Sequence, residues 1–120
     1  GLLGVSGVSN AMQVLEQSDD PACAHAIDMF CFRAASELSQ LIPAMGGLDT
    51  IVFTAGIGEN SARVRAGICS HLEWLGVKVS ASANAENQRI ISDPDSSVAV
   101  AVVATNEESV ILRDTRRLAL

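Results

Sequence analysis

Apolar residues recur at steps of three and four along residues 21–42, which is the spacing of one face of an α-helix. Asp20 is a suitable N-cap for this helix, and Pro21 suits its first position. Pro43 and the glycine pair at 46–47 are expected to end it. The apolar face consists of Ile27, Phe30, Cys31, Ala34, Leu38 and Leu41.

A second amphipathic helix is predicted beyond residue 60. Its apolar positions are Val64, Ile68, Leu72 and Leu75, at steps of four, four and three. Gly76 follows directly, and a glycine at this place commonly caps the C-terminal end of a helix.

Three short apolar runs have the character of strands. Residues 51–55 (IVFTA) are too few for a helix and are nearly all apolar or β-branched, which predicts a strand buried on both faces. Residues 77–80 (VKVS) alternate and predict an edge strand. Residues 98–104 (VAVAVVA) carry the strongest strand signal in the chain.

The remaining segments complete the order of elements. Residues 1–10, rich in glycine and serine, are expected to form a loop with short extended pieces, and residues 81–97 a polar connection. Thr105 and Glu108 form a capping box, which predicts a terminal helix. Buried strands that alternate with helices indicate one α/β domain over residues 1–120, with a largely parallel sheet.

Composition excludes several classes of function. The net charge of −6 repels phosphate backbones, and only 3% of the 120 residues are aromatic, which leaves few stacking surfaces for single-stranded nucleic acid. No window reaches the ~18 apolar residues of a membrane span. Three cysteines cannot all pair within one chain, and reduced thiols of a cytoplasmic protein are the simplest interpretation. We therefore expect neither a nucleic-acid nor a membrane partner.

The stretch GIGEN, residues 56–60, stands between a predicted buried strand and a predicted helix. In open α/β sheets ligands bind at the carboxyl ends of strands, and a helix N-terminus favours an anion there. Glycine lets the backbone approach such a ligand closely. However, Ser61 stands where a dinucleotide fingerprint needs a third glycine, and no Walker-type lysine follows. The pattern alone leaves open a phosphate cradle and a purely structural tight turn.

A second strand-to-helix junction, ATNEES at residues 104–109, carries related chemistry. Glu108 is assigned to the helix cap with Thr105. Glu107 is not needed for that cap and is therefore a candidate to hold a hydrated Mg²⁺ beside a nucleotide. Backbone N–H groups at one strand end and a carboxylate at the next would suit a metal–nucleotide complex.

Four stretches of the sequence resemble the C-terminal part of acetate kinase and of the closely similar propionate kinase. They are GLLGVSGVSN, GGLDTIVFTAGIGENSARVR, LEWLGVKV and ATNEESVILRDT. They lie in family order and cover nearly the whole chain. The resemblance implies the C-terminal lobe of an actin-like, sugar-kinase-type (ribonuclease H-like) fold, in which helices flank a mostly parallel sheet.

The resemblance also implies a function for the full enzyme. Members of this family transfer a phosphoryl group between ATP and a short-chain carboxylate, acetate or propionate, to give an acyl phosphate with Mg²⁺, and they form homodimers. Glu107 would match the magnesium-associated glutamate of the family. The residues that would hold ATP or ADP are Gly56, Ile57, Gly58, Glu59 and Asn60.

The chain departs from the family beside this proposed site. The family usually follows GVSN with Asp-Met-Arg, whose Asp and Arg help to hold the nucleotide, whereas this chain has Ala11, Met12 and Gln13. Each lost charge-assisted hydrogen bond typically forfeits about 1.5–3 kcal/mol. Ala55 stands in place of a usual glycine, and Ala104 in place of a usual proline.

An N-terminal lobe is expected to be absent from these 120 residues. By the resemblance, the catalytic His and Arg residues and the carboxylate pocket belong to that lobe. We therefore expect no catalytic residue here and no phosphoryl transfer by the chain alone, because this reaction needs charge stabilisation from all sides. A non-catalytic dimerisation or interaction module derived from the same lobe is the alternative function.

Two further side chains have simpler interpretations. Arg65 matches a family position that would lie near phosphate, but a surface salt bridge is the simpler expectation for it. Trp74 is expected in the core or at an interface.

Overall fold

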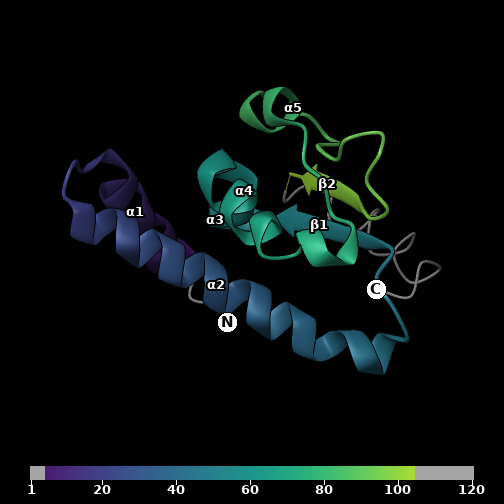
Figure 1. Cartoon of the computed structure of the whole chain (residues 1–120). Coiled ribbons are helices and arrows are strands. Elements are labelled where there is room, and N and C mark those ends of the chain that lie inside the picture. The colour runs from purple at the N-terminus through teal and green to yellow at the C-terminus, as the bar shows by residue number, and fades with distance from the viewer. Residues whose placement is uncertain (1–4, 105–120) are drawn as a thin grey trace.

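Two parallel strands lie at the centre of the computed structural model, which describes the backbone of residues 5–104 and the side chains of residues 11–104. β1 (Thr50–Thr54) pairs with β2 (Ala99–Val103) in register, from Thr50 opposite Ala99 to Thr54 opposite Val103 (Figure 1). The predicted α/β class with parallel pairing is therefore confirmed. Both strands end at the same edge of the sheet.

Two more segments extend the sheet on the far side of β2. Ile90 makes an isolated antiparallel bridge to Ala101, and the N–H of Ile91 donates to the Val100 carbonyl at 2.9 Å. The predicted edge strand at 77–80 is reduced to one bridge, between Val79 and Ser92. It pairs at the edge as expected, but over too short a length to form a strand.

The helix predicted over residues 21–42 is confirmed as α2 (Pro21–Met45). The side chain of Asp20 caps the first turn, and the buried residues of the helix are Ile27, Cys31 and Ala35. The prediction that Pro43 helps to end the helix is wrong, because the helix continues to Met45. Proline in the last turn removes only one hydrogen bond, and Gly46, at φ 77°, provides the left-handed cap.

α1 (Val5–Gln17) occupies most of the segment predicted to be a loop, so that prediction is wrong. Glycine and serine disfavour a helix in isolation. Here the helix packs against α2 and against α3 (Ala55–Asn60), and it buries Met12 (Figure 1). Tertiary packing of one face therefore outweighs the local propensity.

The second predicted helix is divided in the structure. α4 (Ala62–Ser70) is followed by a 3₁₀ turn, η1 (Glu73–Leu75), which Gly76 caps at φ 89° as predicted. A short helix, α5 (Ala81–Ala85), lies in the segment predicted to be an irregular connection.

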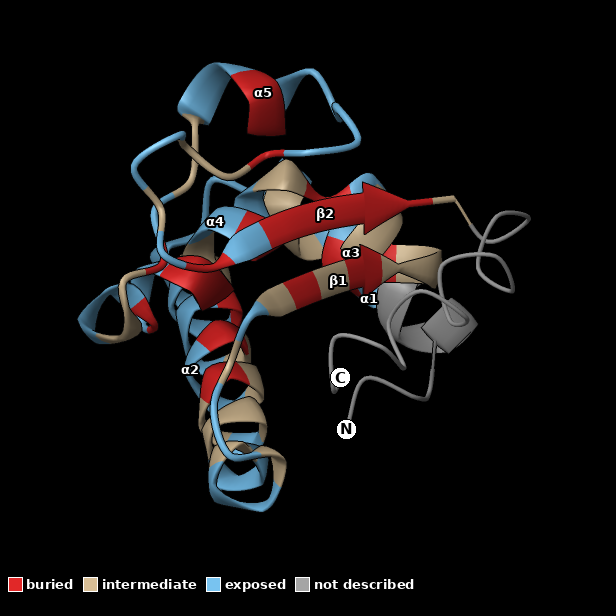
Figure 2. Cartoon of the chain, turned by 90° about the vertical axis from the view of Figure 1, so that its right-hand side faces the viewer, coloured by how far each residue is buried: buried red, intermediate tan, exposed pale blue. Residues whose placement is uncertain are grey.

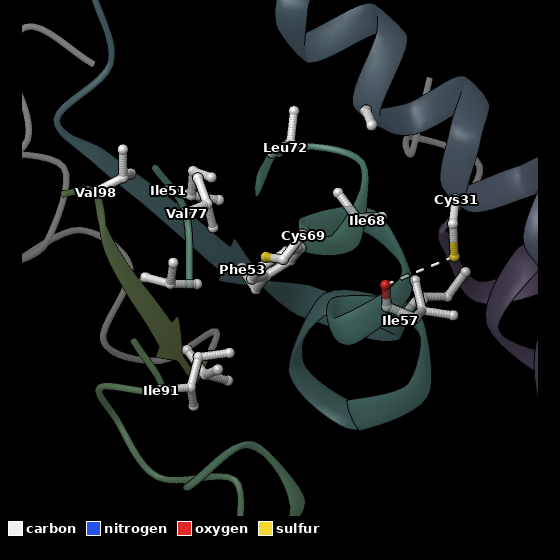
Figure 3. Close-up of a cluster of buried hydrophobic side chains, with 14 of the residues drawn as sticks. Cys31, Ile51, Phe53, Ile57, Ile68, Cys69, Leu72, Val77, Ile91 and Val98 are labelled. Atoms are coloured by element: carbon white, nitrogen blue, oxygen red, sulfur yellow. Dashed lines mark hydrogen bonds between the residues drawn. The ribbon is translucent and has the colours of Figure 1, made fainter. Parts of the chain in front are cut away.

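Buried residues occur on both strands and on the helices (Figure 2), and their apolar side chains form one core (Figure 3). β2 is buried from Val100 to Val103, as predicted. In β1, Ile51 and Phe53 are buried and their neighbours are half buried, so burial on both faces is wrong for this strand. β1 has a hydrogen-bonded neighbour on one side in the described sheet, whereas β2 is flanked on both sides. Trp74 is 72% exposed, so the prediction that it lies in the core is wrong.

Membrane-spanning character is absent from residues 5–104, since none of their helices is both long and apolar enough to cross a bilayer. The three cysteines are free thiols, with Cys31 and Cys69 buried and Cys23 half buried. The predicted terminal helix, with Thr105 and Glu108, lies outside the described residues.

Candidate functional site

A cavity of about 350 Å³ lies at the carboxyl ends of β1 and β2. This is the edge of a parallel sheet at which ligands bind in α/β proteins, and the volume falls within the ~300–1,000 Å³ of small-molecule sites. One wall comes from α3 and the other from the segment after α5 and from the end of β2. The lining residues are Glu59, Asn60, Asn87, Arg89, Val102 and Ala104.

The chain enters this site through an unusual turn. Ala55 has a φ of 56°, and Gly56 has φ 34° and ψ −115°, which interrupts the helical geometry of α3. Such angles suit glycine, and a left-handed conformation costs other residues roughly 1–2 kcal/mol. The side-chain nitrogen of Asn60 donates to the Gly56 carbonyl at 2.9 Å and closes the turn. The segment predicted as a loop is therefore a short, strained helical turn.

Two predicted site residues, Ile57 and Gly58, face the core rather than a ligand on their side-chain side. Ile57 is buried in the core, so only its backbone remains for a ligand (Figure 3). A Cβ at Gly58 would lie 3.5 Å from the backbone and Cβ of Phe53, which is ordinary packing distance. Gly58 thus faces β1 on its Cβ side and is not at a φ that requires glycine.

A second, small cavity of about 30 Å³ adjoins the same turn. Its lining includes Gln13 from α1 together with Gly56, Ile57 and Asn60. α1 therefore brings Gln13 to the predicted nucleotide residues, although the sequence placed no helix there. The position at which the sequence departs from the family it resembles therefore lines the same small cavity as three of the predicted nucleotide residues.

Ser61 has a role that the sequence did not reveal. Its hydroxyl accepts a hydrogen bond from the N–H of Val64 at 3.1 Å and donates to Oε1 of Glu16 at 2.7 Å. It caps α4 and links that helix to α1. One N–H of the first turn of α4 is therefore already satisfied, which leaves this helix end less open to an anion than the sequence predicted.

Arg65 is fully buried, at 0% exposure, so the expected surface salt bridge is wrong. No described carboxylate pairs with it, and its acceptors are carbonyl and amide oxygens of Gly58, Glu59, Asn84 and Asn87. Burial lowers the pKa of its guanidinium, but the ordinary value is so high that the group stays charged.

A signal for this burial was present in the sequence. Arg65 and Cys69 each follow a residue of the apolar stripe, Val64 and Ile68, and both are buried. With Leu72, which belongs to the stripe, they stand at steps of four and three. The stripe was assigned from apolar residues alone, so its charged member was placed on the surface.

Direct evidence for a metal site is lacking in the part of the chain that the structure describes. No group of three or more His, Cys, Asp or Glu residues within 5–104 is arranged to hold a metal ion. The magnesium candidate Glu107 lies outside the described residues. At the end of β1, the Thr54 hydroxyl is buried without a hydrogen-bond partner. Such orphaned groups are rare and call for an additional polar group nearby.

The sequence matches one protein family along most of its length. The family model described as the acetokinase family matches residues 1–113. The acetate kinase of Nitrobacter hamburgensis is 48% identical over 120 residues, and the propionate kinase of Citrobacter rodentium is 48% identical over 123 residues. Each match covers 100% of this chain and 30% of the relative. The chain thus spans about a third of the length of the curated relatives it matches.

Solved structures give the same result for the fold. The acetate kinase of Porphyromonas gingivalis superposes with a TM-score of 0.69 at 34% identity, over 100% of this chain and 32% of that one. The propionate kinase of Francisella tularensis gives 0.72 at 34% identity, over 90% and 28%. The predicted fold is therefore confirmed as the one that this part of these kinases adopts.

Proposed function

The chain belongs to the acetokinase family, and we propose that it is the nucleotide-binding part of a kinase that transfers a phosphoryl group between ATP and acetate or propionate. One observation carries the proposal: the polar cavity at the shared carboxyl edge of β1 and β2, which residues Glu59 and Asn60 at the end of α3 help to line. We assign nucleotide contacts to residues 56–60, with the backbone of Ile57 and the side chain of Asn60 among them.

The residues at this edge fit the chemistry of a nucleotide. Asn60, Asn87 and Arg89 bring amide and guanidinium groups to the cavity wall, and these suit ribose and phosphate oxygens. The orphaned hydroxyl of Thr54 stands at the same strand end. When bound, Mg-ATP would supply the phosphoryl group and a cation that neutralises its charge. We assign Glu107 as the residue associated with that Mg²⁺.

Catalysis itself is assigned to a part of the full protein other than these 120 residues. The chain would bind and orient the nucleotide, and the carboxylate substrate would be held elsewhere. A mixture of the 120-residue chain, ATP, Mg²⁺, acetate and hydroxylamine should therefore give no acyl hydroxamate above background. Robust turnover would contradict this division of roles.

We also propose that the full protein forms a homodimer and lies in the cytoplasm. The free thiols of Cys23, Cys31 and Cys69 suit a reducing compartment. Phe32 and Trp74 are 52% and 72% exposed, and aromatic side chains are enriched at protein–protein interfaces.

The nucleotide assignment can be tested by restoring the charges that the family has. In Ala11→Asp/Gln13→Arg, the new arginine would start from a position that lines the small cavity with Gly56 and Asn60, and would extend towards a nucleotide at the turn. We expect calorimetric titration with Mg-ADP to show at least tenfold tighter binding, since a charge-assisted hydrogen bond contributes about 1.5–3 kcal/mol.

The matched control is Gln17→Arg, an exposed glutamine at the last position of the same helix. It places the same positive side chain away from the turn and should leave the affinity nearly unchanged. The double substitution leaves the net charge unchanged. Equal gains in both variants would therefore show that an arginine at either position of α1 attracts the nucleotide, and would count against the assigned site.

A non-catalytic dimerisation or interaction module is the second candidate. It is favoured by Ala11 and Gln13, which present no charge where the family holds the nucleotide. This candidate predicts a stable dimer by light scattering and no nucleotide binding at millimolar concentration, even after the two charges are restored.

A further inference from the structure

Arg65 connects the two walls of the cavity at the strand ends. Its Nη1 donates to the carbonyls of Gly58 at 3.0 Å and Glu59 at 3.1 Å, in the last turn of α3. Its Nη2 donates to the carbonyl of Asn84 at 2.9 Å and to Oδ1 of Asn87. Its Nε donates to Oδ1 of Asn84 at 2.8 Å. A guanidinium has five N–H donors in one plane, so all of them are engaged.

The acceptors of Arg65 belong to opposite sides of the cavity. Glu59 is on the wall formed by α3, and Asn87 is on the wall formed by the segment after α5. Asn84, which is 5% exposed, also donates its side-chain nitrogen to the Ala62 carbonyl at 2.8 Å. The network therefore joins α3, α4, α5 and the residue at 87 through one buried cation.

Burial makes this connection rigid. A buried cation is costly unless every donor has a partner, so displacement of either wall would leave an N–H of Arg65 unsatisfied. The planar fork also fixes the directions of the five hydrogen bonds, which a flexible ammonium group cannot do. The distance between the walls is thus coupled to a single side chain.

We propose that Arg65 is a positioning residue, which holds the Glu59–Asn60 wall and the Asn87–Arg89 wall at the separation that a nucleotide requires, without contacting the nucleotide. Its complete burial and its engaged donors exclude direct contact with a ligand. This inference rests on the proposed function, because the ligand of the cavity is taken to be a nucleotide.

The decisive variant is Arg65→Lys, which keeps the positive charge but has a single nitrogen with three donors and so cannot replace the five hydrogen bonds of the fork. We expect the dissociation constant for Mg-ADP to rise at least tenfold. We also expect faster amide hydrogen exchange at residues 58–61 and 87–89, with unchanged exchange in β1. The matched control is Arg63→Lys, since Arg63 is exposed on the same helix and should change neither measurement.

A milder variant keeps the proposal testable if Arg65→Lys does not fold. Asn87 has a φ of 52°, which glycine adopts without strain, so Asn87→Gly removes one acceptor of Arg65 while preserving the backbone. It should accelerate exchange in both walls, including residues 58–61, to which Arg65 links Asn87. A local effect confined to residues 86–88 would overturn the proposal.

The outcomes separate this inference from the proposed function. A purely structural role would lower the melting temperature of Arg65→Lys and leave the dissociation constant of the folded protein unchanged, which would overturn the inference alone. Failure of the unsubstituted chain to bind Mg-ADP would overturn the proposed function and, with it, the nucleotide-positioning role. Unchanged exchange in both walls of Arg65→Lys would show that Arg65 does not connect them.

Discussion

Ala55 is a single residue with a direct energetic consequence. Its φ of 56° costs a residue with a Cβ roughly 1–2 kcal/mol, and glycine removes that cost while losing about 0.4–1 kcal/mol through a freer unfolded chain. We expect Ala55→Gly to raise the free energy of unfolding by about 0.5–1 kcal/mol, measured by urea denaturation.

The matched substitution, Ala66→Gly, should lower the free energy of unfolding. Ala66 is exposed within α4, where glycine costs about 1 kcal/mol through poor helix propensity. Destabilisation by both substitutions would mean that the turn at residue 55 is not strained.

The buried thiols make stability depend on pH. Burial, the largest cause, raises the pKa of Cys31 to about 11 and that of Cys69 to about 12, while an unfolded thiol titrates near 9. Above pH 9 the unfolded state therefore releases protons that the folded state keeps, and the free energy of unfolding falls as the pH rises towards these values. We expect a loss of about 1 kcal/mol per thiol between pH 8 and pH 10.

Denaturation curves at the two pH values provide the measurement, and Cys69→Ala separates the thiol from other titrating groups. The variant should lose less stability than the unsubstituted chain over the same interval. An identical loss would show that Cys69 ionises as readily in the folded state as in the unfolded one.

At the residue scale, the sequence pointed to two residues of the cavity wall, Glu59 and Asn60, because residues 56–60 follow a recognisable strand. Arg65 could not be placed correctly from apolar periodicity alone, since its burial depends on acceptors up to 22 positions away in sequence. The hydrogen bond between Ser61 and Glu16, 45 positions apart, was equally invisible before the fold was known.

At the scale of elements, the contact between α2 and α4 depends on Gly67, which has no side chain. A Cβ at Gly67 would lie 2.6 Å from the Sγ of Cys31 and 3.2 Å from its Cβ. Cys31 also directs its thiol to the Val64 carbonyl, at 3.7 Å (Figure 3). The two helices therefore approach as closely as these residues allow.

Gly67→Ala tests this packing. Overpacking a core typically costs about 1–3 kcal/mol, and the better helix propensity of alanine returns up to ~1 kcal/mol. We expect thermal unfolding to show that Gly67→Ala lowers the free energy of unfolding by about 1 kcal/mol. The double variant Cys31→Ala/Gly67→Ala should recover part of this loss. Gly58→Ala is the control, since its new Cβ would meet Phe53 at an ordinary 3.5 Å. No penalty for Gly67→Ala would mean that the helices can separate freely.

The elements that were predicted well have strong local signals in the sequence. α2 and β2 have long periodic or continuous apolar patterns, and Asp20 and Gly46 mark the ends of α2. α1 and α3 were missed because their helical state depends on packing and on the special angles at Gly56. Local propensity opposes both, and only the folded environment decides between the alternatives.

At the scale of the whole molecule, the parallel strands and the connections around them make one polar edge. Segments that are distant in sequence meet there: the turn after β1, residues 87–89 and the end of β2. The fold itself followed from the order of strands and helices and from the family resemblance. The joining of the cavity walls through Arg65 did not, because it is a property of the assembled fold.

The central claim is that this edge binds a nucleotide, and amide chemical-shift mapping during titration of the chain with Mg-ADP tests it most directly. The predicted result is saturable shifts that concentrate at residues 56–60 and 87–89. No shifts at millimolar Mg-ADP would contradict the claim. So would shifts confined to the separate cavity of about 600 Å³ between α4 and α5, which includes Cys69 and Val79.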